Sequence, residues 1–85
     1  MRTSEEIARD LSNVRLAYVS IVKDADRQRL SIYECAGRDT LETMKRNLTE
    51  LLREAEGLNA RLYNQAVTVY NAIEAVLEEA PLDED

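Results

Sequence analysis

The sequence has no histidine, no tryptophan and no phenylalanine, and it has a single cysteine, Cys35. One cysteine excludes a disulfide bond within a single copy of the chain. Without histidine and with only one thiol, a zinc site lacks its usual ligands, and acid–base catalysis lacks its commonest proton-transfer group. We therefore expect no metal and no cofactor, and we interpret Cys35 as a reduced, buried thiol in a cytoplasmic protein.

The sequence also lacks a hydrophobic run long enough to cross a bilayer. Its first residues turn acidic at Glu5 and Glu6 before any long apolar segment begins, which is unlike a secretory signal. These two features predict a cytoplasmic protein that has no membrane partner.

Positive charge is missing from the C-terminal end of the chain. Residues 74–85 contain no Lys or Arg, and their six acidic residues equal the whole net charge of −6: Glu74, Glu78, Glu79, Asp83, Glu84 and Asp85. The remainder is formally neutral and lacks the basic surface that phosphate groups require, so we expect no general binding of nucleic acid. We interpret residues 81–85 as an acidic tail, which is either solvated or a docking strip for a basic partner.

Apolar residues recur at steps of three and four, and this spacing predicts helices. In the first segment they are Ile7, Leu11, Val14, Tyr18, Ile21 and Ala25. Thr3 and Glu6 have the spacing of a capping box and Gly37 is a natural helix end, so we predict one helix from about Ser4 to Ala36. Two alternatives stay open: a β-hairpin at about 16–35, formed by two partly β-branched runs, or a break near residues 24–26.

The second segment is predicted to begin with Asp39 as its cap, because Glu42 follows three residues later. Its apolar stripe consists of Leu41, Met44, Leu48, Leu51, Ala55 and Leu58. Gly57 and Asn59 then indicate a break and a new helix, which is expected to end at Pro81. The stripe of this last helix consists of Leu62, Ala66, Val69, Ile73, Val76 and Ala80. Because a seven-residue apolar step also runs through Gly57, one continuous helix over 40–79 is the alternative.

These patterns predict an all-α fold with a single helical domain at 1–80 and the acidic tail at 81–85. The domain is either a three-helix bundle or a long antiparallel helical hairpin, and an α+β fold with the hairpin at about 16–35 is the alternative. A chain of this size buries only about 60–65% of its unfolded surface, which favours an oligomer.

Two apolar rows lie beside the main stripes and make the nonpolar faces wider than one neighbouring helix covers. The last helix carries Tyr63, Val67, Tyr70 and Leu77, and the first helix carries Leu16, Val19 and Val22. Neighbouring helices of a bundle are one possible cover, and a second copy or another protein is the other. Tyrosine suits interfaces because it joins an apolar ring to a polar tip, so we predict a protein interface at these residues and a dimer as the simplest assembly.

The last helix also presents a polar row, whose spacing places most of its members on one surface: Arg61, Asn64, Gln65, Thr68 and Asn71. Such side chains are able to read base edges in a DNA groove. No flanking Lys or Arg is present to hold phosphates, so we interpret the row as a solvated face or a polar protein contact.

The succession of a long, a short and a medium helix resembles the layout of the small all-helical chorismate mutases. That family places an Asp-x-x-Arg-Glu run at the start of its second helix, where this chain has Asp39-Thr40-Leu41-Glu42-Thr43. Glu42 puts an acid where the family has an arginine, and an acid there would repel a dicarboxylate substrate. The resemblance therefore extends to layout only. We predict that the protein is not an enzyme.

The sequence thus predicts a helical protein-interaction module that associates with itself. A small acidic inhibitor or regulator, of phage or toxin-neutralising type, that binds a basic surface of another protein is the alternative. A DNA-binding regulator that uses Arg61, Asn64 and Gln65 is a minor third hypothesis.

Overall fold

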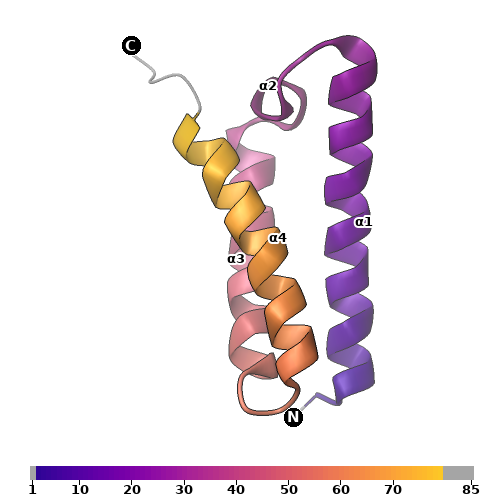
Figure 1. The fold of residues 1–85 in the computed structure, drawn as a ribbon, viewed down its shortest axis with the longest axis vertical. Coiled ribbons are helices and arrows are strands. Elements are labelled where there is room, and N and C mark those ends of the chain that lie inside the picture. The colour runs from indigo at the N-terminus through magenta and orange to yellow at the C-terminus, as the bar shows by residue number, and fades with distance from the viewer. Residues whose placement is uncertain (1, 80–85) are drawn as a thin grey trace.

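The computed structural model describes residues 2–79, and within this range it contains four helices and no strand. They are α1 (Ser4–Gln28), α2 (Ile32–Ala36), α3 (Arg38–Ala55) and α4 (Ala60–Glu79). The three long helices lie along the long axis of the molecule, and α2 lies at the end opposite the N-terminus (Figure 1). The all-α class is confirmed. The alternative hairpin at about 16–35 is wrong, because residues 16–28 are part of α1.

The first helix ends at Gln28, well before the predicted end at Ala36. Arg29 adopts a left-handed conformation with φ 59°, and its backbone N–H donates to the carbonyl groups of Ala25 and Asp26. Ser31 then caps α2 through a reciprocal pair of hydrogen bonds with Glu34. The prediction of one helix to Ala36 and the alternative break at 24–26 are both wrong, because this second capping box starts a new helix five residues before Gly37.

The third helix begins at Arg38, with Gly37 as its N-cap. The predicted cap at Asp39 is therefore wrong, because Asp39 lies within the first turn and Glu42 accepts a hydrogen bond from Arg38 at 3.1 Å. The Arg38 guanidinium lies 5.9 Å from the centre of the Tyr33 ring and donates to the Tyr33 hydroxyl at 3.2 Å. This exposed contact joins side chains on the two sides of the corner between α2 and α3.

The chain reverses between α3 and α4, as Gly57 and Asn59 indicate. Gly57 has a φ of 77°, a value that side-chain-bearing residues rarely adopt. The side-chain oxygen of Asn59 accepts from the backbone N–H groups of Arg61 and Leu62, at 3.1 and 3.2 Å. One continuous helix over 40–79 is therefore wrong, and Leu58 is 48% exposed in the turn instead of extending the apolar stripe of α3. The predicted end at Ala80 and Pro81 lies outside the described residues.

The core lies mainly between α3 and α4, which form an antiparallel pair (Figure 1). Its buried members are Ile7 and Leu11 from α1, Leu41, Met44, Leu48, Leu51 and Ala55 from α3, and Leu62, Ala66, Val69 and Ile73 from α4. The predicted inner stripe of α1 is confirmed, since Val14, Tyr18 and Ile21 pack against this core and Ala25 is buried.

The molecule is thin, with Cα extents of 42 × 27 × 16 Å. Packed helix axes lie about 8–10 Å apart, so the shortest extent corresponds to two layers of helices. Within the molecule α1 lies at one edge, and the other helices lie on one side of it (Figure 1). None of the four helices has the length and apolar character needed to span a bilayer.

Candidate protein interface

The first helix is most deeply buried near its two ends. Ile7 and Leu11 are each 1% exposed at its N-terminal end, and Ala25 is 3% exposed near its C-terminal end. Between Leu11 and Ala25 no residue of α1 is fully buried. The middle of α1 is therefore less deeply buried: Val14, Tyr18 and Ile21 pack against the core, while Leu16 and Val19 are exposed.

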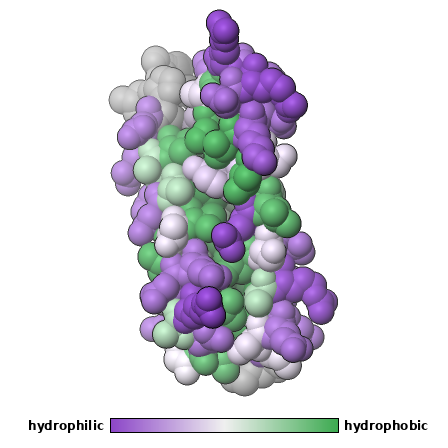
Figure 2. Space-filling model, turned by 45° about the vertical axis from the view of Figure 1, so that its right-hand side comes forward, coloured by the Kyte–Doolittle hydropathy of each residue, from purple (hydrophilic) through white to green (hydrophobic). Residues whose placement is uncertain are grey.

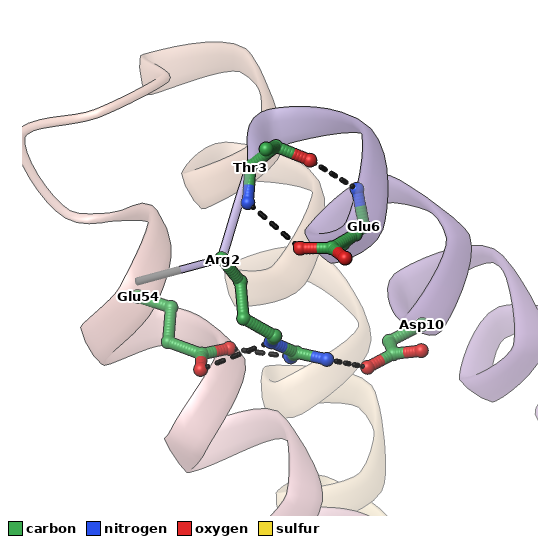
Figure 3. A network of polar contacts seen from close by, with 5 residues as sticks. All are labelled: Arg2, Thr3, Glu6, Asp10 and Glu54. Carbon is green, nitrogen blue, oxygen red and sulfur yellow. Dashed lines mark hydrogen bonds and ion pairs between the residues drawn. The ribbon is translucent and has the colours of Figure 1, made fainter.

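Polar contacts reinforce the N-terminal attachment (Figure 3). Arg2 donates to both carboxylate oxygens of Glu54 on α3, at 2.6 and 3.2 Å, and it also pairs with Asp10 on α1. Hydrogen bonds to Glu54 and Asp10 raise the pKa of the Arg2 guanidinium. Thr3 and Glu6 form the predicted capping box, so the start of α1 is held in place both along the chain and across to α3.

The middle of α1 presents two large apolar side chains to solvent. Leu16 is 64% exposed and Val19 is 45% exposed, while Val22 beside them is half-buried. Tyr18, on the inner side of the same turns, is half-buried against the core, and burial raises the pKa of its hydroxyl group. Of the predicted row, Leu16 and Val19 thus lie at the surface, and Val22 is covered in part.

Figure 2 shows the molecule with the side that carries α1 turned towards the viewer. Apolar residues extend along the middle of this view of the molecule, and hydrophilic residues border them on both flanks. An apolar centre with a polar rim is the arrangement found in protein interfaces. Arg9 and Asp26 also lie on the outer side of α1. Both are exposed, as Leu16 and Val19 are, and the helical spacing of the four residues places them on one face.

The predicted row on α4 has a different environment. Tyr63, Tyr70 and Leu77 are partly buried and pack against the core, while Val67 is partly buried but is not in contact with that cluster. The ammonium group of Lys45 on α3 lies 5.6 Å from the centre of the Tyr70 ring and 3.6 Å from a carboxylate oxygen of Glu74. Within one copy, the core and Lys45 of α3 therefore cover part of this row.

The predicted polar row on α4 is mostly solvated. Arg61, Asn64, Thr68 and Asn71 are exposed. The Thr68 hydroxyl donates to the backbone carbonyl of Asn64 within the helix. Gln65 is half-buried and lies with Arg61 at the edge of a shallow hollow next to Ser4 and Ala8 of α1. Gln65 and Arg61 thus lie on the side of α4 that faces α1, and Gln65 is the one member of the row that is half-buried.

Other candidate chemistry is sparse in residues 2–79. Cys35 is half-buried on α2, so the prediction of a buried thiol is met in part. The described residues contain no group of three or more Cys, Asp or Glu side chains placed to hold a metal ion. A hollow of about 310 Å³ lies between α1 and α3 and is lined by Arg2, Asp10, Asn13, Val14, Asn47, Glu50 and Leu51.

Comparison of the chain with known protein families, with curated proteins and with solved structures finds no match.

Proposed function

We propose that this protein is a helical interaction module that associates with a second copy of itself through the exposed face of α1. The observation that carries the proposal is the exposure of Leu16 and Val19, at 64% and 45%, in the middle of a helix that is anchored near both ends. Single exposed apolar residues are common on soluble proteins. Here two of them lie one helical turn apart, beside the half-buried Val22, on a helix with neighbours on one side only.

The anchored ends of α1 make this face suitable for association. A preformed helix loses little conformational freedom when it binds, so less of the contact free energy is offset by ordering. The capping box at Thr3 and the Arg2 contacts with Asp10 and Glu54 hold α1 before any partner arrives. A helix that presents Leu16 and Val19 in this way is a helix-to-helix docking surface.

The proposal is tested by the molar mass in solution, measured by light scattering over a range of protein concentrations, with circular dichroism on the same samples. We expect the mass to rise from monomer towards dimer with concentration. Leu16→Glu should lower the association because it places a charge at the centre of the apolar face. Leu58→Glu is the matched control, because Leu58 is similarly exposed, at 48%, but lies in the turn between α3 and α4.

Two results would contradict the proposal. The first is a monomeric mass at all concentrations for the unmodified protein. The second is an equal loss of association in Leu16→Glu and Leu58→Glu, since that would point to general stickiness and not to α1. A helical circular dichroism spectrum for both variants ensures that the comparison is between folded proteins.

A further inference from the structure

The outer side of α1 carries a regular stripe of residues that are not part of the core. Its members follow one another at steps of four and three residues, and all of them are exposed: Glu5, Arg9, Ser12, Leu16, Val19, Lys23 and Asp26. A step that averages 3.5 residues keeps a stripe facing a partner helix along its whole length. We refer to these seven residues as the outer stripe.

The outer stripe is complementary to a second copy of itself that runs in the opposite direction. Counted outward from the point between Ala17 and Tyr18, Leu16 and Val19 are equally distant, and so are Ser12 and Lys23. The next pair is Arg9 and Asp26, which carry opposite charges. Two copies of α1 that lie antiparallel across a twofold axis at this point would place each residue opposite its counterpart.

We propose that two copies of the chain pair through their outer stripes in this antiparallel register, an inference that rests on the self-association proposed above. In it, Leu16 packs against the partner subunit's Val19, and Arg9 forms an ion pair with the partner subunit's Asp26. The twofold axis repeats both contacts. The apolar residues thus lie at the centre of the contact and the charge pairs lie towards its ends, which is the usual anatomy of an interface.

The charges favour this register over the other ways of covering α1. A parallel pair would place Arg9 beside Arg9, Lys23 beside Lys23 and Asp26 beside Asp26, and like charges at such positions repel. Neither Arg9 nor Asp26 forms an ion pair within residues 2–79, whereas Arg27, on the same turn as Asp26, pairs with Asp24. The stripe has two acidic and two basic members, so it offers a strongly acidic or strongly basic partner no net attraction.

The size of the contact sets the strength to expect. The outer stripe spans 22 of the 25 residues of α1, which is about 32 Å at about 1.5 Å per residue. Only Leu16 and Val19 are apolar, and a single helix pair buries less than the roughly 800 Å² per partner of a standard interface. The dimer is therefore weak, with a dissociation constant of about 10 μM or higher.

A charge-exchange series tests the register. The variants are Arg9→Asp, Asp26→Arg and the double variant Arg9→Asp/Asp26→Arg, and dimer dissociation constants are measured by analytical ultracentrifugation at low ionic strength. Each single variant turns two attractive pairs into two repulsive ones, so we expect at least about a tenfold weaker dimer. The double variant restores opposite charges at both positions and should bind within about threefold of the unmodified protein.

Leu16→Glu, measured in the same series, separates the failure of this inference from the failure of the proposed function. Self-association through α1 is wrong if the unmodified protein does not dimerise, or if Leu16→Glu dimerises as strongly as the unmodified protein. The proposed register is then wrong as well. If Leu16→Glu abolishes the dimer but the double variant stays as weak as the single ones, the antiparallel register is wrong while self-association through α1 stands. Recovery in the double variant supports the register, because a parallel pair predicts no loss in the single variants.

Discussion

At the scale of single residues, the clearest local conflict is Arg29, which adopts a left-handed backbone conformation with φ 59°. Its side chain is exposed, and it is the only residue other than glycine with a positive φ in residues 2–79. The left-handed region costs an L-residue with a side chain about 1 kcal/mol, and helices commonly end with glycine in this conformation for that reason. Arg29 therefore weakens the connection between α1 and α2.

We expect Arg29→Gly to stabilise the protein by about 0.5–1 kcal/mol, because it removes the backbone cost and loses no buried contact. Gly57→Ala is the reverse case. The φ of Gly57 is 77° and nothing lies within 4 Å of an added Cβ, so its destabilisation, also about 1 kcal/mol, would come from the backbone alone. Urea unfolding followed by circular dichroism measures both changes. A loss of stability in Arg29→Gly would show that the Arg29 side chain contributes more than its exposure implies.

At the scale of elements, the sequence predicted which residues face inward better than it predicted where helices end. The sequence predicts the inner stripe of α1, the capping box at Thr3 and the turn at Gly57, because apolar spacing and capping chemistry are local signals. The end of α1 at Gln28 was not predicted, because the apolar frame continues through Ile32 into α2. Here the Ser31 and Glu34 capping box overrides the periodic pattern.

Of the candidate site, too, the sequence predicts one part and leaves another part open. That Leu16, Val19 and Val22 lie off the inner stripe follows from helical spacing alone. That Tyr63, Tyr70 and Leu77 pack against the core does not follow from spacing, because it depends on which side of α4 faces the other helices. Two adjacent stripes on one helix look alike in sequence, and only the packing of the other helices decides which of them is left exposed.

The deeper burial of α1 near its ends than in its middle predicts an uneven stability along the molecule. Amide hydrogens in the middle of α1, at residues 13–23, should exchange faster than those of α3 around Leu48, which is 0% exposed. Hydrogen exchange followed by mass spectrometry, at protein concentrations low enough to keep the monomer, measures the difference. Ile7→Ala is the informative variant, because loss of this anchor should accelerate exchange throughout α1 and much less in α3 and α4. Equal protection of α1 and α3 would contradict a loosely attached first helix.

At the scale of the whole molecule, the small size of the chain and the position of α1 have a common consequence. An 85-residue chain buries a modest fraction of its surface, and α1 lies at one edge of the molecule with the other helices on one side of it (Figure 1). The second copy proposed above would add, on that side, contacts that only the folded state makes. Under this proposal association and folding stability are linked, and the stability of the protein should depend on its concentration.

This linkage gives the last prediction. Above the dissociation constant of the dimer, the thermal midpoint should rise by about 3–5 °C for each tenfold increase in protein concentration, because the dimer forms only from folded chains. Leu16→Glu should make the midpoint independent of concentration. It should leave the midpoint of dilute samples within about 2 °C of the unmodified protein, because a side chain that is 64% exposed contributes little to the monomer. Differential scanning calorimetry at several concentrations separates the two effects. A large drop in the midpoint of Leu16→Glu at high dilution would mean that Leu16 stabilises the monomer. A midpoint of the unmodified protein that does not change with concentration would mean that the face of α1 binds no second copy.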